Sequence, residues 1–354
     1  MSTPILKTLS DFIGVLPEKQ KEVISKRYGL FGDDPMTLEA IGQENGVTRE
    51  RIRQIEEIAL DALRKNIDSL SDTVEALKYQ LDILGGIRRE KKLLEEASNT
   101  LSDDPARLLK DKKEIDRLQN NVWFLLDLAP HFNYLLERKN NHSAWYREPE
   151  VLKKVDSIHK YVKKELKREN KPLSIDQYHE LVHKVMKEFG IKNENVLLSY
   201  LDLSKEFGFN PFYQFGLTEW PLINPVSVNS KAKLILSSVQ KPLHFEELTG
   251  LINKAGFEGD KNARSTTVHN ELIKDPDFIL IGRGLYALSD WGYEPGTVKD
   301  VLVKIMKKTG PKAYRDLVEE MKKHRIVKDA TILINLQDKK LFKKLPDGRY
   351  ALAK

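Results

Sequence analysis

Apolar residues recur at helical spacing along most of the chain, and this pattern predicts a mainly α fold. The first such pattern covers residues 16–30. After a polar loop, two further helical patterns flank Asn45-Gly46, a pair that favours a turn with positive φ. We therefore expect three helices in this part of the chain, the last two joined tightly. The expected core side chains of the first helix are Val23, Ile24 and Tyr28.

A threonine precedes each of the two later patterns. Thr is a favoured N-cap because its hydroxyl oxygen accepts a hydrogen bond from a backbone N–H of the first helical turn. Thr37 is expected to cap a helix over residues 38–43, and Thr48 a longer helix with Arg51 at its third position. Val47 would anchor the turn in the core. The longer helix has a predicted buried stripe at three- and four-residue spacing, Ile52, Ile55, Ala59 and Leu63.

The face opposite that stripe carries side chains suited to duplex DNA, because the first turns of a recognition helix reach base edges in the major groove. Arg matches guanine, Gln matches adenine and Glu accepts from cytosine N4, whereas a helix N-terminus suits phosphate oxygens. Arg51 is expected to support the backbone. The pattern predicts a DNA-binding helix-turn-helix. Its predicted DNA-binding residues are Thr37, Thr48, Arg49, Glu50, Arg51, Arg53 and Gln54.

Residues 66–140 read as a helical connector with two apolar heptad patterns. The first ends at Gly85-Gly86, and the second begins about 30 residues later. They predict either an intramolecular helical hairpin or a homodimer seam, and the gap between them favours the hairpin. The first pattern consists of Leu60, Leu63, Ile67, Leu70, Val74, Leu77, Leu81 and Leu84, and the second of Ile115, Leu118, Val122, Leu125 and Phe132.

The rest of the chain repeats one layout three times, over residues 145–225, 226–295 and 296–354. Each copy has a helix in which an aromatic residue is followed by apolar residues three and seven positions later, so that all three share a face. A β-hairpin with glycine-containing turn residues follows. Helices followed by a hairpin predict tandem winged-helix modules. The triplets are Tyr178/Leu181/Val185, Phe245/Leu248/Ile252 and Tyr314/Leu317/Met321.

Positive charge is concentrated near the C-terminus. The whole sequence has a net charge of +6, whereas residues 300–354 carry 12 Lys and 3 Arg against 5 Asp and 2 Glu, an excess of +8 (15 minus 7). Such a module suits phosphate binding, although a solvated lysine-rich surface has the same composition. The lysines expected to bind phosphate are Lys322, Lys323, Lys343 and Lys344.

No catalytic residue, metal or cofactor is predicted. The sequence contains no cysteine, which excludes disulfides and thiolate chemistry, and no apolar run long enough for a membrane span. The N-terminus lacks the features of a signal peptide, so we expect a cytoplasmic protein. His179 and His183 fit the HExxH pattern of zinc peptidases, but the repeat places both off the core stripe.

The string Val-Thr-Arg-Glu-Arg-Ile-Arg-Gln-Ile-Glu at 47–56 resembles region 4 of sigma-70 family factors, and the likeness extends over residues 16–65. This resemblance implies that Arg49, Glu50, Arg53 and Gln54 read the upstream promoter hexamer. It also implies that residues 16–30 correspond to the surface that grips the RNA polymerase flap. With only 15 residues before this segment, no promoter-melting region is expected, and therefore no self-sufficient initiation factor.

Lys-Pro-Leu-His-Phe at 241–245 and Gly-Leu-Tyr-Ala-Leu at 284–288 resemble the HARE-HTH winged-helix domain. The likeness is clear for residues 226–295 and fainter in the two flanking copies. It implies a module associated with DNA or with RNA polymerase.

The predicted organisation is a sigma-type helix-turn-helix (1–65), a helical connector or coiled-coil hairpin (66–140) and three winged-helix repeats. The predicted function is sequence-specific binding of promoter-like double-stranded DNA in the bacterial nucleoid, as a transcription regulator with RNA polymerase core as partner. Two alternatives stay open: an architectural DNA-binding protein without polymerase contact, and a polymerase-bound scaffold for protein interactions.

Overall fold

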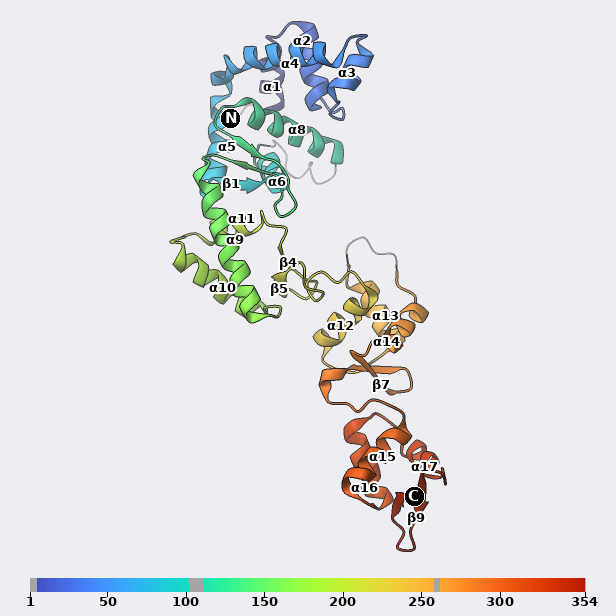
Figure 1. The fold of residues 1–354 in the computed structure, drawn as a ribbon. Helices are drawn as coiled ribbons and strands as arrows, with labels where there is room; N and C mark the ends of the chain where they lie inside the picture. Colours follow the sequence, from blue (N-terminus) through green and yellow to red (C-terminus); the bar gives the residue numbers. More distant parts are fainter. Residues whose placement is uncertain (1–4, 102–110, 258–261, 354) are drawn as a thin grey trace. The chain divides into compact units, whose positions relative to one another are not determined.

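The computed structural model describes residues 5–101, 111–257 and 262–353. The chain divides into two compact units, Met1–Phe207 and Gly208–Lys354. The fold is mainly α with short antiparallel strands, as predicted (Figure 1). None of the helices in the described ranges combines the length and hydrophobicity that a membrane span requires.

Unit 1 begins with the helices that surround the predicted helix-turn-helix and continues through a small sheet into three further helices. Its elements are α1 (Ile5–Ile13), α2 (Glu18–Tyr28), α3 (Leu38–Glu44), α4 (Arg49–Arg64), the 3-10 helix η1 (Ile67–Leu70), α5 (Ser71–Ile83), β1 (Ile87–Arg89), α6 (Glu90–Leu101), α8 (Lys112–Leu128), β2 (Asn133–Leu135), β3 (Ala144–Tyr146), α9 (Glu150–Glu169), α10 (Ile175–Glu188) and α11 (Glu194–Leu201).

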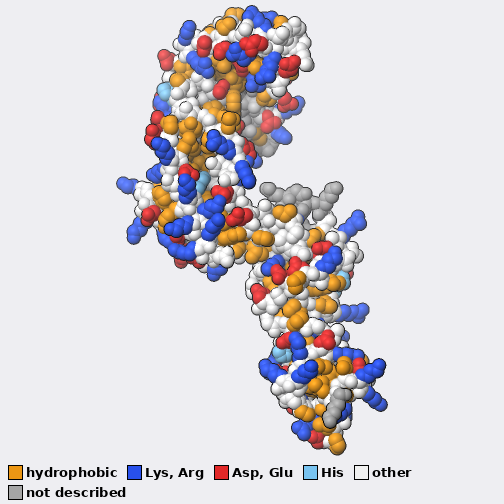
Figure 2. All heavy atoms as spheres, in the orientation of Figure 1, with side chains coloured by type: hydrophobic (Ala, Val, Ile, Leu, Met, Phe, Trp, Pro, Cys, Tyr) orange, Lys and Arg blue, Asp and Glu red, His pale blue; other side chains and the backbone are white. Residues whose placement is uncertain are grey.

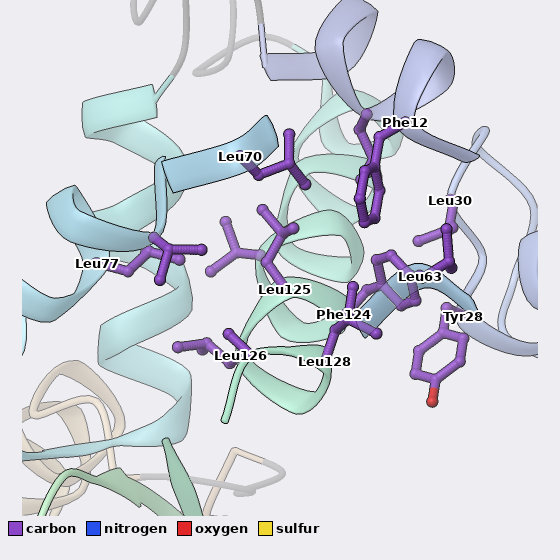
Figure 3. Close-up of a cluster of buried hydrophobic side chains, with 14 of the residues drawn as sticks. Phe12, Tyr28, Leu30, Leu63, Leu70, Leu77, Phe124, Leu125, Leu126 and Leu128 are labelled. Atoms are coloured by element: carbon purple, nitrogen blue, oxygen red, sulfur yellow. The ribbon is translucent and has the colours of Figure 1, made fainter. Parts of the chain in front are cut away.

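The apolar heptad does not form one continuous helix. Helix α4 ends at Arg64 and η1 begins at Ile67, because Asn66 leaves helical geometry at φ −108° and ψ 9°. The heptad side chains nevertheless turn inward and share one core with the apolar side chains of α8 (Figure 3). Leu63, Leu77 and Leu81 are at most 1% exposed. This intramolecular burial gives no support to the predicted homodimer seam.

A three-stranded antiparallel sheet, in the order β1-β3-β2, interrupts the predicted helical connector. Gly85 and Gly86, at φ +85° and +82°, lead the chain from α5 into β1. The prediction of a purely helical segment over 66–140 is therefore wrong at β1 and β2. Strands of three residues are too short to produce an alternating pattern, and both pair with β3, which lies outside the segment. Residues 102–110 of the segment lie outside the described residues.

Unit 2 contains two modules in which three helices are followed by an antiparallel β-hairpin within the described residues; the first module has in addition the strand β6 and the 3-10 helix η2. Leu248 and Ile252 are buried in the core of the first module, and Leu317 and Met321 in that of the second, as predicted. Strand β4 (Phe207–Phe209) spans the boundary between the two units. The remaining elements of unit 2 are β5 (Phe215–Leu217), α12 (Val228–Val239), β6 (Leu243–His244), α13 (Phe245–Lys254), α14 (Ser265–Lys274), β7 (Phe278–Gly282), β8 (Leu285–Leu288), η2 (Ser289–Trp291), α15 (Val298–Thr309), α16 (Tyr314–His324), α17 (Asp329–Leu336), β9 (Phe342–Lys344) and β10 (Tyr350–Leu352).

Arg325 connects the two modules of unit 2. Its side chain is 5% exposed, and its guanidinium donates to the carbonyl oxygens of Leu280 in β7 and Gly296 before α15. The backbone N–H of the next residue, Ile326, donates to the carbonyl of Ile281 at 3.2 Å. The modules are therefore joined by specific hydrogen bonds as well as by the chain between them.

Candidate nucleic-acid interface

The connection between α3 and α4 has the predicted cap and turn chemistry. The Thr37 hydroxyl accepts from the backbone N–H of Ala40 at 3.2 Å, and the Thr48 hydroxyl accepts from that of Arg51 at 3.2 Å. Gly46 has φ +65°, a conformation that side-chain-bearing residues rarely adopt. Both helices therefore start at positions set by the local sequence, and the turn at Gly46 leads from the C-terminal end of α3 to the capped N-terminus of α4.

Helix α4 is buried along the predicted stripe. Ile52 and Ile55 pack with Val23 of α2 in one core, while Ala59 and Leu63 belong to the larger core that includes α8. None of these stripe residues is more than 6% exposed. Removing this much apolar surface from water fixes the rotation of the helix about its axis, so the opposite face must point outward.

The outward face brings the predicted reading residues together. Arg49, Glu50, Arg53 and Gln54 are all exposed on the first turns of α4. Arg53 donates to both carboxylate oxygens of Glu50, at 2.8 and 3.0 Å, and to Glu57 at 3.1 Å. These contacts favour one orientation of the Arg53 guanidinium, although all three side chains are exposed.

Hydrogen bonding also sets the ionisation of this face. The hydrogen bond from Arg53 is the main cause that holds the pKa of the Glu50 carboxyl below its ordinary value, and a contact with Gln54 adds to it. Arg51 donates to the Gln54 amide oxygen at 3.2 Å. Arg51, Gln54, Glu50 and Arg53 therefore form one connected polar network. Arg49, by contrast, makes no ion pair with any carboxylate in the part of the chain that the structure describes.

Two side chains near this face were not predicted. Glu57 binds Arg53 one helical turn beyond the reading residues. Arg27, in the last turn of α2, pairs with Glu56 of α4 at 3.2 Å and donates to the carbonyl of Met36 at 3.0 Å. The contact between Arg53 and Glu57 could have been predicted from the sequence, because side chains four residues apart on a helix are neighbours. The contact between Arg27 and Glu56 depends on how α2 packs against α4, which local spacing does not reveal.

The segment 16–30, predicted to face the polymerase flap, is covered on its apolar side by α8. The Tyr28 and Phe124 rings meet edge-on at 4.8 Å, and the Tyr28 hydroxyl donates to Asp127 at 2.8 Å (Figure 3 shows both rings in the core). Asn120 donates to the carbonyl of Gly29 at 3.3 Å. The apolar side chains of this segment are therefore already buried within unit 1.

The four predicted phosphate-binding lysines come from two elements of the C-terminal module. Lys322 and Lys323, in the last turn of α16, already pair with Asp329 at 2.8 Å and Glu320 at 3.0 Å. Lys343 and Lys344 are exposed on β9, with the Lys344 ammonium 5.9 Å from the centre of the Tyr350 ring. Lys322 and Lys323 are thus paired with carboxylates, whereas no ion pair is found for Lys343 and Lys344 among the described residues; the carboxylate of the hairpin turn, Asp347, pairs with Arg349 at 2.6 Å.

His179 and His183, the histidines of the HExxH string, both lie on the exposed side of α10. Tyr178, Leu181 and Val185 of the same helix are buried, as the repeat predicts. The HExxH spacing therefore coincides with the outward side of an amphipathic helix.

Comparison with known proteins places a family at the N-terminal part of the chain. Residues 12–65 match the model of the family described as Sigma-70, region 4. Two relatives, the RNA polymerase principal sigma factor HrdD of Streptomyces viridifaciens and that of Streptomyces coelicolor, are each 47% identical to this chain over 57 residues. The matched stretch is 16% of this chain and 17% of each relative.

The family match covers α2, α3, the turn at Gly46 and α4. Residues 12–65 therefore contain a sigma-70 region 4 helix-turn-helix, as predicted. The HARE-HTH likeness of the later modules and their division into three repeats stay predictions.

Proposed function

We propose that this protein is a sequence-specific DNA-binding regulator of transcription that reads promoter-like duplex through α4 and acts with RNA polymerase. The observation that carries the proposal is the exposed polar network of α4, which lies within the segment matching sigma-70 region 4. The mechanism is binding without catalysis, at the nucleoid in the cytoplasm. No activity of a whole sigma factor is implied, since the matched stretch is only 17% of each relative.

We propose a role for each side chain of the network. Arg53, oriented by Glu50, presents its fork of N–H donors to guanine, and Gln54 reads a neighbouring adenine. Glu50 stays ionised at neutral pH and accepts from cytosine N4. Arg49, which has no carboxylate partner among the described residues, reaches a base edge or a phosphate.

Thr37 and Thr48 contribute at the DNA backbone. Each hydroxyl oxygen accepts from its own helix, which leaves the hydroxyl hydrogen available to donate to a phosphate oxygen. The N-terminus of α4, capped by Thr48, adds partial positive charge that suits a phosphate oxygen.

The test is selection of binding sites from a random duplex library by the full chain. Gln54→Ala should relax the sequence preference at one base pair, by about 1–3 kcal/mol. The matched control is Gln20→Ala, which makes the same chemical change on α2 and should leave the preference unchanged. An unaltered selection profile for Gln54→Ala would show that the readout assignment is wrong.

We also infer that the modules at 226–295 and 296–354 are winged helices of the HARE-HTH type. Their support is the shared order of three helices and a hairpin, with a strand or bridge preceding the second helix in each, β6 in one and Lys312 in the other. The phosphate-binding role of Lys343 is tested by salt dependence: Lys343→Ala would flatten the slope of log affinity against log salt by about 1.

One observation favours a second candidate function, an architectural DNA-binding protein without polymerase contact. Helix α8 covers the apolar side of residues 16–30, where the flap contact was predicted. Affinity capture of the tagged full chain with RNA polymerase core, with and without nuclease, separates the two. Capture that survives nuclease supports polymerase association, whereas capture that is lost with the DNA supports the architectural role.

A further inference from the structure

Helix α17 exposes apolar side chains where a DNA-reading helix would expose polar ones. Ile332 and Leu336 are buried in the core of the C-terminal module. On the outward side, Leu333 is 39% and Ile334 65% exposed, and Leu341, just after the helix, is 37% exposed. Leu333 and Ile334 lie four and three residues before Gln337, so both are helical neighbours of a residue that lines an adjoining hollow. Exposed apolar side chains that are continuous with a hollow mark a surface that binds another apolar surface.

A hollow lies next to this helix, between its C-terminal end and the hairpin. Its volume is about 430 Å³, and its lining combines apolar and basic side chains. Leu336 and Phe342, which are largely buried, and the Tyr350 ring contribute the apolar part. Three lysines also line it, Lys339, Lys343 and Lys344.

The charge around the hollow is unbalanced. Lys339, Lys343 and Lys344 are exposed, and no ion pair to a carboxylate is found for them within residues 262–353. On the face of unit 2 visible in Figure 2, hydrophobic side chains lie among Lys and Arg side chains in the C-terminal module. A ligand that fits must therefore combine negative charge with apolar groups.

Duplex DNA meets only half of this requirement. Phosphates would satisfy the lysines, but the groove edges of DNA offer little apolar surface besides the thymine methyl group. A protein segment that carries Asp and Glu around apolar side chains satisfies both, because its apolar residues enter the hollow and its carboxylates meet the ammonium groups.

We propose that the outward face of α17 and the adjoining hollow are a docking site for an acidic segment of a partner protein that carries two or more apolar anchor residues. The docking surface consists of Leu333, Ile334 and Leu341 with the rim of Lys339, Lys343 and Lys344. It goes beyond the DNA reading proposed for α4 and does not depend on it. It assigns Lys343 and Lys344 to carboxylates of the partner in place of phosphates, so a Lys343→Ala variant that keeps the parent's salt slope for DNA binding agrees with it, and a flattened slope contradicts it.

The experiment begins with a phage-displayed library of random 12-residue peptides panned on the full chain, with Ile334→Glu as the counter-selection. The expected peptides carry Asp or Glu around at least two apolar residues. The matched control is Ile273→Glu on α14, because Ile273 is 60% exposed and the change is identical. Both variants alter exposed side chains, and unchanged thermal unfolding checks that they fold.

Binding of an enriched peptide, synthesised with a fluorescent label, is then measured by anisotropy. Ile334→Glu and the pair Lys343→Glu/Lys344→Glu should each weaken its binding at least tenfold, whereas Ile273→Glu should stay within twofold of the parent chain. Absence of enrichment, peptides without acidic residues, or equal binding to Ile334→Glu would overturn the proposal.

The Ile334→Glu variant also tests two other occupants of the docking surface, duplex DNA and a second copy of this chain. If Ile334→Glu weakens binding of a 20-base-pair duplex tenfold, the face binds DNA and the proposal is wrong. If sedimentation equilibrium shows a dimer of the parent chain and a monomer of Ile334→Glu, the occupant is a second copy and the proposal is also wrong. Unchanged DNA affinity and an unchanged monomer, together with loss of peptide binding, support it.

Discussion

Helices α4 and α17 both bury an apolar stripe, but their exposed faces differ: that of α4 is polar and that of α17 is apolar. Helix α4 packs against α2, α3 and α8, and α17 packs against α15 and α16. Each buries an apolar stripe, that of α4 in two cores and that of α17 in the core of the C-terminal module. The exposed face of α4 carries charged and amide side chains linked by hydrogen bonds, whereas that of α17 carries Leu333 and Ile334.

The difference shows that a helical cluster of this kind does not determine its ligand. The buried stripe decides which face points outward, and the side chains on that face decide what it binds. A connected polar face can read hydrogen-bonding groups in a groove, since its donors and acceptors are already oriented. An apolar face gains free energy only against another apolar surface. The predictions below test this contrast, from the largest effect to the smallest.

The buried stripes of α4 and α17 should contribute similarly to the unfolding free energy of their units. Leu63→Ala in α4 and Leu336→Ala in α17 each remove a side chain that is at most 3% exposed, and each should lower the unfolding free energy of its unit by about 2–5 kcal/mol. Hydrogen exchange of peptides from each helix in the full chain measures the loss. Ile58→Ala, at a 55% exposed position of α4, is the control and should change stability by less than about 0.5 kcal/mol. Equal effects at Ile58 and Leu63 would contradict the two-faced description.

The outward faces should differ in their effect on DNA. Arg53→Ala should weaken binding to the selected duplex by about 1–3 kcal/mol, and Arg53→Lys should also weaken it because Lys lacks the planar fork. Arg64→Ala, in the last turn of α4, is the matched control. Fluorescence anisotropy at fixed salt gives the affinities. If Arg64→Ala costs as much as Arg53→Ala, charge and not position determines binding.

The helix starts differ as well, since Thr48 caps α4 whereas Lys328, at the N-cap of α17, makes no side-chain cap hydrogen bond. Thr48→Ala should lower stability by about 1 kcal/mol. Lys328→Ser should raise it by up to about 1 kcal/mol, because the backbone at 328 is already extended at φ −72° and ψ 143°. Thermal unfolding of the two variants checks the signs. A gain from Thr48→Ala would show that its observed cap bond contributes nothing.

The smallest expected effect is a change in the titration of Glu50. Its folded-state pKa is lowered, so the contribution of its pair with Arg53 is present above the ordinary glutamate pKa and is lost as the pH falls through the lowered value. Carbon-detected NMR should give a Glu50 midpoint below the ordinary one, and Arg53→Ala should move it upward. The Arg64→Ala variant should leave it in place. If the Glu50 midpoint is the same in Arg53→Ala as in the parent chain, Arg53 does not stabilise the ionised Glu50 and the network is not preorganised.

Local chemistry explains why so much of the helix-turn-helix could be predicted. Caps, a glycine at positive φ and a stripe of apolar residues depend on neighbours within a few positions, and Thr48, Gly46 and Ile52 behave as their spacing indicates. The same holds for Leu248 and Leu317 in unit 2.

Features that depend on distant partners could not be predicted in this way. Strand β1 exists because β3 pairs with it, and three residues carry no pattern of their own. The cover that α8 provides for Tyr28 joins residues about a hundred positions apart. The exposure of Ile334 could not be predicted from the sequence. Apolar residues occupy nearly every position of residues 330–336, so their spacing does not indicate which side of the helix faces the core.

The cover over Tyr28 has a further consequence for any partner of α2. Because α8 belongs to the same chain, it behaves as a tethered competitor whose effective concentration is on the order of millimolar. Asp127 and Asn120 hold the positions that an outside ligand of this face would have to occupy. A ligand that binds the Tyr28 side of α2 would have to displace α8, so its binding and the release of an internal helix would be one coupled equilibrium.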